Sequence, residues 1–348
     1  MTFIFNIFLS LVQILLDNYD GTLTMKSNIL NNSYINIYKC LLTEDANCVL
    51  SYFNDYSILS TKKITIENIK AKRTIEEHTK SCISLLLLKN KRIASCSYDG
   101  TIRIFKLSDT YKNERVIRRK SSDISSICEL DDGSIVSCSL DGSIAFDNFT
   151  IKEAHQYRIR KVLTLPNNRI VTFSEDVKIW KSNQPYSERP LKVIYRKYNA
   201  ILYIKKYDIF LACNKTDLTF WSMSSYQIIT VIKEVTCNAE NAIYQIDNEL
   251  VVIGALKKIT IVNINKGTIE KVFQNNELDQ VRCFMMMRDD KTIACGCNQG
   301  KICFYNMENQ SHLIVKTEHS GGISDLLKID DNVFLTASFD NSIKIWNY

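Results

Sequence analysis

The sequence predicts an all-β fold made of repeated sheets of short strands. Runs of alternating apolar and polar residues recur along the 348 residues, with short polar turns between them. The C-terminal stretch shows this most clearly. There two alternating runs, 333–339 and 342–348, are joined by the turn Asp340-Asn341, as in a tight antiparallel hairpin. A third run, 323–329, precedes them, so the unit is a small meander of strands.

This meander recurs with a period near 40 residues. One apolar position in the last strand of each unit can be aligned at Ile64, Ile102, Ile144, Val177, Leu218, Ile259, Ile302 and Ile343. The gaps between neighbouring positions are 38, 42, 33, 41, 41, 43 and 41 residues. A period of this length with several strands per unit predicts a β-propeller, which is a ring of small sheets.

The composition fits a soluble globular protein in a reducing compartment. The chain is 45% apolar and 24% charged, which argues against disorder. With only 10 Gly and 3 Pro, Asn, Asp and Lys must supply many of the turns. The 12 cysteines lie mostly in apolar, strand-like runs, which indicates reduced, buried thiols and favours a cytoplasmic location. The net charge of +6 is well below that expected of a dedicated nucleic-acid binder.

Residues 1–32 form an apolar extension ahead of the repeats, which we assign to residues 33–348. The run 2–16 is shorter than the roughly 20 residues of a membrane span. It has no basic residue before it and no small-residue cleavage site after it. The alternatives are a helix that packs on the domain, an upstream extension ahead of a start at Met25, and a signal-like segment. Membrane contact through residues 2–16 is the less favoured of these.

Three segments carry a more specific pattern. They are 94–105 (ASCSYDGTIRIF), 136–146 (VSCSLDGSIAF) and 335–346 (LTASFDNSIKIW). These segments resemble the WD-repeat (WD40) family of β-propellers, and the resemblance extends over nearly the whole chain from about residue 33. In that family a blade is held by a His before the first strand, a Ser or Thr in the second strand, an Asp in the turn and a Trp in the third strand.

The resemblance implies structural sets of this kind in three units. The last unit has all four residues, His319, Thr336, Asp340 and Trp346. The second unit has His78, Ser95 and Asp99, with Phe105 in place of Trp, and the fourth has His155, Thr172 and Trp180 with a turn two residues shorter. The separation from His to Asp is 21 residues in both the second and the last unit. The other units are degenerate, with Lys120 in the His position of the third.

The number of third strands predicts eight blades, with seven as the alternative. The chain stops at Tyr348 with a third strand, and the resemblance implies that a strand from the N-terminal side completes the last blade. The segment 33–42 (SYINIYKCLL) is available for this role, and such closure would remove an open sheet edge. A seven-bladed ring would leave the apolar runs within 48–69 without a partner strand.

The sequence predicts no catalytic or metal site. His78, Ser95 and Asp99 are the residue types of a nucleophilic triad, but the same set recurs at the period of the fold, which indicates a structural role. The cysteines at the equivalent positions 96, 138 and 213 belong to different sheets, which lie too far apart for their thiolates to share a metal ion. We therefore expect no enzyme activity, no cofactor and no small-molecule substrate.

Basic residues gather where the chain enters the third, fourth and fifth units, blades 3–5 of the predicted ring. They are Arg115, Arg118, Arg119, Lys120, Arg158, Arg160, Lys161, Arg196 and Lys197. Their periodicity places them near one face, where they could bind an acidic or phosphorylated peptide, a phosphoinositide membrane or the nucleic-acid backbone. The alternative is a set of solvated loop charges that are partly paired with nearby acids.

The resemblance implies a rigid, non-catalytic scaffold that mediates protein–protein interactions within a larger complex. Its partners would be other proteins. This expectation rests on analogy with the family and identifies no particular complex. A propeller that binds a phosphoinositide membrane or nucleic acid through the basic face is the second hypothesis, and an enzyme is the least favoured.

Overall fold

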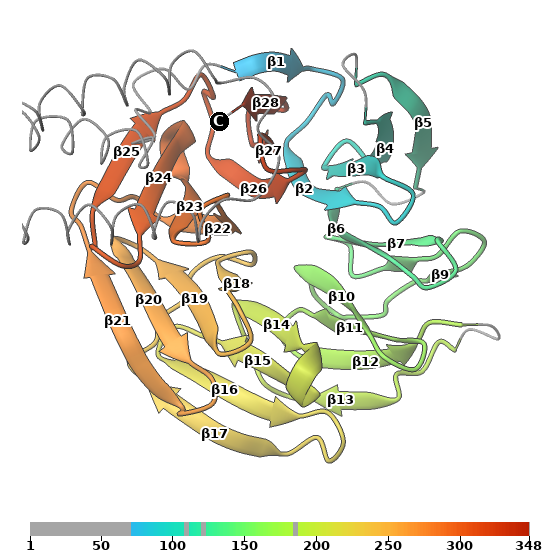
Figure 1. Ribbon diagram of the computed structural model, residues 1–348. Helices are drawn as coiled ribbons and strands as arrows, with labels where there is room; N and C mark the ends of the chain where they lie inside the picture. Colours follow the sequence, from blue (N-terminus) through green and yellow to red (C-terminus); the bar gives the residue numbers. More distant parts are fainter. Residues whose placement is uncertain (1–70, 108–110, 120–122, 184–186, 348) are drawn as a thin grey trace, which may run out of the picture. The chain divides into compact units, whose positions relative to one another are not determined.

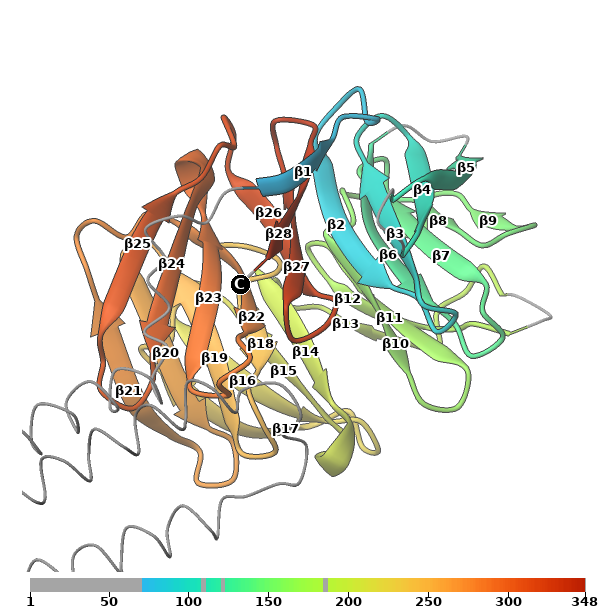
Figure 2. The same cartoon turned by 45° about the horizontal axis from the view of Figure 1, so that its top comes forward.

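Seven four-stranded antiparallel sheets form a ring in the described part of the chain (Figure 1). The computed structural model describes residues 71–107, 111–119, 123–183 and 187–347. In six sheets the strands follow one another in chain order, and in the last the order is β1-β28-β27-β26. The turned view in Figure 2 shows the sheets standing face to face around the ring.

We number the sheets as blades 1 to 7 in chain order. Blade 1 consists of β2 (Cys82–Leu87), β3 (Arg92–Ser97), β4 (Thr101–Lys106) and β5 (Asn113–Arg118). Blade 2 consists of β6 (Ile124–Glu129), β7 (Ile135–Ser139), β8 (Ile144–Ala145) and β9 (Thr150–Ile151). Blade 3 consists of β10 (Lys161–Leu165), β11 (Arg169–Phe173), β12 (Val177–Lys181) and β13 (Lys192–Ile194). Blade 4 consists of β14 (Ala200–Ile204), β15 (Ile209–Cys213), β16 (Asp217–Ser222) and β17 (Ile228–Lys233).

The remaining blades follow the same plan. Blade 5 consists of β18 (Ile243–Gln245), β19 (Leu250–Ala255), β20 (Lys258–Asn263) and β21 (Thr268–Gln274). Blade 6 consists of β22 (Val281–Met286), β23 (Thr292–Cys297), β24 (Lys301–Asn306) and β25 (His312–Lys316). Blade 7 consists of β26 (Ile323–Lys328), β27 (Val333–Ser338), β28 (Ile343–Asn347) and β1 (Ala71–Ile75). Two short 3-10 turns, Lys205–Tyr207 and Asn298–Gly300, lie between strands.

The prediction of eight blades is wrong, because blade 7 packs directly on blade 1. The hydroxyl of Ser324 on β26 donates to the carbonyl oxygen of Cys82 on β2 at 2.6 Å. Side chains of the two blades also share one buried cluster, in which Leu335 of blade 7 packs with Leu85 and Ile93 of blade 1. No room is left for another sheet between them. The apolar runs within 48–69, which we counted toward an eighth blade, lie outside the described residues.

The outer position of blade 7 is occupied by β1, which pairs antiparallel with β28. Ile75 lies opposite Ile343, and the ammonium group of Lys344 donates to the hydroxyl of Thr74 at 3.0 Å. The segment 33–42, which we predicted for this position, lies outside the described residues. So do the apolar extension 1–32 and the aligned position Ile64.

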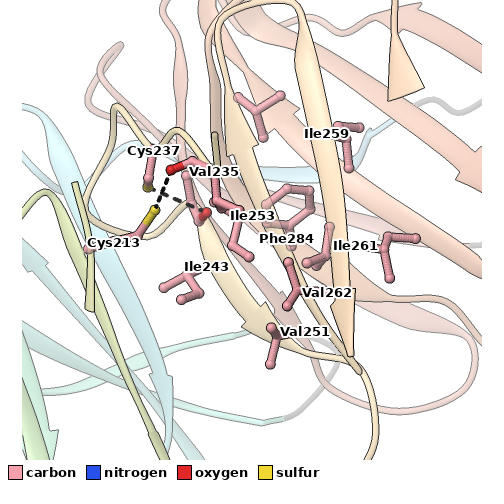
Figure 3. Close-up of a cluster of buried hydrophobic side chains, with 14 of the residues drawn as sticks. Cys213, Val235, Cys237, Ile243, Val251, Ile253, Ile259, Ile261, Val262 and Phe284 are labelled. Atoms are coloured by element: carbon pink, nitrogen blue, oxygen red, sulfur yellow. Dashed lines mark hydrogen bonds between the residues drawn. The ribbon is translucent and has the colours of Figure 1, made fainter. Parts of the chain in front are cut away.

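The second strand of each blade is the most deeply buried, because neighbouring sheets cover both of its faces. Every residue of β7, β15 and β23 is buried, and small or apolar side chains fill these strands. The ten cysteines of the described residues are all buried free thiols. In the cluster between blades 4 and 5, the thiol of Cys213 points toward the carbonyl oxygen of Val235 at 3.6 Å (Figure 3). Cysteine here serves as a small apolar residue.

Polar side chains near the start of a first strand connect neighbouring blades. In blade 2 the hydroxyl of Ser125 donates to the carbonyl oxygen of Ile159 at the entry to blade 3, at 2.6 Å. In blade 7 the carboxylate of Asp325 accepts from the backbone N–H of Leu85 at 2.9 Å and the hydroxyl of Ser84 at 3.0 Å. Both strands carry a register shift at this point. The shift aims one side chain at the next sheet.

Two turn glycines fix the spacing between blades. Gly142 has φ +84°, and a Cβ atom there would lie 2.3 Å from the carbonyl oxygen of His155. Gly300 has φ +65°, with the carbonyl oxygen of His319 equally close. In each case the turn of one blade lies against the residue that begins the next, so no larger side chain fits without a backbone shift. Elsewhere non-glycine residues such as Asn168 and Asn341 adopt positive φ.

Replacement of Asp325 tests the contact between blades 7 and 1. Asp325→Ala should lower the free energy of unfolding by about 2 kcal/mol, because two partly buried donors lose their acceptor. Urea unfolding measures this change. Asp331→Ala removes an exposed carboxylate of the same blade and should change stability by less than about 0.5 kcal/mol. Equal stability of Asp325→Ala and the wild type would show that this contact does not hold the ring closed.

Candidate partner-binding face

Three blades contain a buried imidazole that is hydrogen-bonded through both of its nitrogens. In blade 7, His319 Nδ1 lies 2.8 Å from Asp340 Oδ2 and Nε2 lies 2.6 Å from Thr336 Oγ1. Because the carboxylate can only accept, Nδ1–H donates to Asp340 and Nε2 accepts from the hydroxyl. The indole Nε1–H of Trp346 donates to Thr336 Oγ1 at 2.9 Å. Every polar atom of this buried chain of groups therefore has a partner.

The set in blade 1 has the same geometry without the tryptophan. His78 Nδ1 lies 2.9 Å from Asp99 Oδ2, and Nε2 lies 2.7 Å from Ser95 Oγ. Phe105 is fully buried in the same blade and cannot donate. The backbone N–H of Thr79 also donates to Asp99, at 3.1 Å. The imidazole thus joins the entry to the first strand, the second strand and the following turn.

Blade 3 completes its set with Asp176, a residue that the sequence analysis missed. His155 Nδ1 lies 2.5 Å from Asp176 Oδ1, and Nε2 lies 2.7 Å from Thr172 Oγ1. Trp180 Nε1 donates to the same threonine at 2.8 Å. The shortened turn hid the aspartate, although its separation from His155 is the same 21 residues as in the other two sets. This constant spacing would have identified Asp176 from the sequence.

Burial and hydrogen bonding shift the pKa values of these groups. Burial lowers the pKa of His78 and of His155, although the neighbouring carboxylates act in the opposite direction. Burial alone would raise the pKa of Asp99, but hydrogen bonds from Thr101, His78 and the N–H of Thr79 outweigh it and lower the pKa to about 2. Similar hydrogen bonds lower the pKa of Asp340. The sets of blades 1 and 3 therefore favour a neutral imidazole beside an ionised carboxylate.

Blade 4 has no histidine and uses a different pair. The indole Nε1–H of Trp221 donates to the phenolic oxygen of Tyr198 at 3.0 Å, and both side chains are buried. The amide of Asn199 donates to the carbonyl oxygen of Cys237 at 2.7 Å. Direct hydrogen bonds thus tie the entry of this blade to its third strand and to the chain that enters blade 5.

These sets hold in place one face of the ring, which we call the entry face. It consists of the connections that enter each first strand and the turns from second to third strands. Tyr98, Arg158, Glu240 and Phe339 come from four different blades or their entries and line a pocket at the centre of this face. The guanidinium of Arg282 lies 4.6 Å from the ring centroid of Phe339 and donates to Asn298 at 2.5 Å. Loops from distant parts of the sequence thus form one surface.

The basic residues predicted from the sequence fall into separate environments. Arg115 and Arg118 lie on β5, the outer strand of blade 1. Arg119 is almost buried and donates to the carbonyl oxygens of Phe146 and Ile135 in the next blade, at 2.9 and 2.8 Å. Lys120 lies outside the described residues.

The others lie on or near the entry face. Arg158 is exposed at the central pocket. Burial lowers the pKa of Lys161, and the charge of Asp325 partly offsets this shift. Arg196 lies over the ring of Trp221 at 6.0 Å. Arg160 and Lys197 come together in a groove.

This entry-face groove extends across the entries and turns of blades 3 to 6, with a volume of about 710 Å³. Its charged lining residues are Arg160, Lys197 and Lys215. Its other lining residues are Asn199, Thr236, Asn238, Ala255, Leu256 and Gln280. No carboxylate of the described residues lines it. Sequence analysis predicted Arg160 and Lys197 as part of a basic patch but missed Lys215 and the uncharged members, which no motif marks.

The floor of the groove is the connection from blade 4 to blade 5. Val235, Cys237 and Ala239 are buried, and Thr236 and Asn238 alternate with them. The backbone N–H of Cys237 donates to the carbonyl oxygen of Asn214 at 2.9 Å, which holds the segment extended. Apolar residues at every second position therefore turn the intervening polar side chains toward the groove.

The described residues contain no cluster of His, Cys, Asp and Glu that could hold a metal ion. Within the same residues, no helix is long and apolar enough to cross a membrane. The histidines that hydrogen-bond to carboxylates are buried at 5% relative exposure or less. These sets act as internal supports of the face.

The ring of seven four-stranded antiparallel sheets makes this protein a β-propeller. Among solved structures, the WD40 β-propeller domain of Doa1 superposes with a TM-score of 0.66. The match covers 80% of this chain and 97% of that chain at 14% sequence identity, so it supports the fold alone. No curated protein is significantly similar to the sequence.

Two of the repeats also match a family model in sequence. Residues 69–106 and 311–347 match the family model described as WD domain, G-beta repeat. The second range contains the complete set of His319, Thr336, Asp340 and Trp346. The two matched ranges and the fold together support a WD-repeat β-propeller.

Truncation of Asp176 tests the set in blade 3. Asp176→Ala should lower the free energy of unfolding by about 1–3 kcal/mol, because the buried N–H of His155 loses its acceptor. The change can be measured by urea denaturation. Glu188→Ala, which removes an exposed carboxylate of the same blade, should leave stability within about 0.5 kcal/mol. A similar small effect for both variants would contradict a supporting role for Asp176.

Acid should destabilise the ring through these same groups. Since folding lowers the pKa of His78 and His155, the unfolded chain binds more protons below about pH 6.5, and stability falls as the pH drops through the folded values. The lowered pKa of Asp99 adds a loss between about pH 4 and pH 2.

Urea midpoints measured from pH 8 to pH 5 should decrease, and His78→Gln should show a smaller decrease than the wild type. The exposed His312 supplies the control variant His312→Gln, which should keep the full dependence. If His78→Gln kept the full dependence as well, the titration would belong to other groups.

Proposed function

We propose that this protein is a non-catalytic interaction platform of the cytoplasm that holds other proteins in a larger complex through its entry face. The observation that carries the proposal is that the residues capable of catalysis are bonded to one another inside the blades. The imidazole, hydroxyl and carboxylate groups of three blades are bonded to one another in the interior, at the same spacing in each. They hold loops in position and leave those loops free for contact.

The form of the entry face supports the same function. It joins loops of several blades around an exposed arginine, partly exposed aromatic rings and a groove whose cations are only partly compensated. Aromatic and arginine side chains are the usual anchors of protein interfaces. Rigid loops lose little conformational entropy on binding, so a face supported in this way suits durable association.

Affinity capture with the tagged full chain tests the proposal. We expect specific proteins to be retained by the wild type and lost by Arg158→Glu, which reverses an exposed charge at the central pocket. Lys205→Glu makes the same change in the turn between β14 and β15, at the opposite end of blade 4, and should retain them. The absence of any protein that discriminates between these variants would overturn the entry face as the partner-binding surface.

A further inference from the structure

The entry-face groove carries positive charge that the described residues only partly compensate. Glu175 forms ion pairs with Arg160 at 3.2 Å and with Lys197 at 2.5 Å, and the hydrogen bond from Lys197 lowers its pKa. Lys215 is exposed and forms no ion pair with a described carboxylate. One carboxylate thus serves two of the three cations, and the groove keeps a net positive charge that favours an anionic ligand.

The uncharged lining suits an extended peptide. Thr236 and Asn238 present a hydroxyl and an amide that form no hydrogen bond within the described residues. Such groups can pair with the backbone N–H and C=O groups of a peptide. Leu256, in the turn between β19 and β20, is 56% exposed at the wall. An exposed leucine beside cations can contact an aliphatic side chain of a peptide while the cations pair with a neighbouring acidic side chain of the same peptide.

Phosphate and nucleic acid fit this groove less well. The Nη atoms of Arg160 donate to Asn199 and Glu175, and its Nε is buried without a partner in the described region. No free guanidinium fork therefore remains for bidentate contact with a phosphate group. Lysines act as separate point charges, which carboxylates at successive positions can match. Among the described residues no aromatic side chain lines the groove, so bases would find no stacking surface there.

We infer that the entry-face groove binds an acidic peptide segment of a partner protein, with glutamate or aspartate at Lys215 and Lys197 and an aliphatic side chain at Leu256. This inference rests on the proposed function and specifies the chemistry of the partner. The peptide lies along the connection from blade 4 to blade 5, between the turn that carries Lys215 and the turn that carries Leu256.

Fluorescence anisotropy with the full chain tests the inference directly. The probe is a labelled peptide of the sequence Glu-Leu-Glu-Glu-Leu-Glu. Lys215→Glu should weaken binding at least about tenfold, because it replaces an attraction by a repulsion in a groove that holds other charges. Leu256→Ser should weaken it about threefold, and Lys205→Glu, at the far end of the same blade, by less than about twofold. Affinity should also fall as salt is raised.

Three comparison ligands decide the chemistry. The same peptide with Gln in place of Glu should not bind detectably. A phosphoserine in that Gln peptide, or single-stranded polyuridine, should bind more weakly than the acidic peptide. If either of these ligands bound more tightly than the acidic peptide, and if Lys215→Glu weakened that binding, the ligand of the groove would belong to that class instead.

The inference is overturned if the wild type does not bind the acidic peptide or if Lys215→Glu binds it unchanged. Either result leaves the capture experiment with Arg158→Glu to decide the proposed function by itself. If the wild type captures partners through the central pocket while the groove fails to bind the peptide, only the inference about the groove falls.

Discussion

The doubly bonded imidazole is the interaction on which the entry face of blades 1, 3 and 7 depends. A histidine between a carboxylate and a hydroxyl fixes three segments of chain at once, namely the entry to a blade, its second strand and its following turn. The net energy of each hydrogen bond is about 1 kcal/mol, but leaving a buried donor or acceptor unpaired costs more. The imidazole, hydroxyl and carboxylate therefore occur together in three blades, although blade 1 has Phe105 in place of the tryptophan. Blade 4 shows a replacement, with Tyr198 and Trp221 as the bonded pair.

The sequence predicted the fold class because equivalent strands of successive blades are buried to a similar degree. The second strands are covered on both faces and read as runs of small apolar residues, and this pattern recurs near every 40 positions. The same periodicity could not separate seven blades from eight. Whether a strand-like run belongs to the ring depends on the packing of the last sheet against the first, as in the bond from Ser324 to Cys82. That contact joins residues 242 positions apart, and no local pattern records it.

The candidate site could be predicted only in part, for a related reason. His78, His155 and His319 were found because each set lies within one unit at fixed spacing. Asp176 was missed because the turn of its blade is shorter, although its separation from the histidine is the same as in the other two sets. Lys215, Asn238 and Leu256 belong to different loops that meet only through the curvature of the ring. Their residue types are common in exposed loops. Only the fold, which brings them together, shows that they line one groove.

The pairing of β1 with β28 has a consequence for synthesis of the chain. Thr74 and Lys344, which lie in contact there, are 270 positions apart. Six blades can therefore assemble as they leave the ribosome, while the partners of β1 and the first blade have not yet been translated. Until the final segment emerges, the strands at that boundary present unsatisfied backbone and apolar groups to the cell. The nascent chain would depend on chaperones most at the end of translation, and a late stop codon would be more damaging than the few residues it removes suggest.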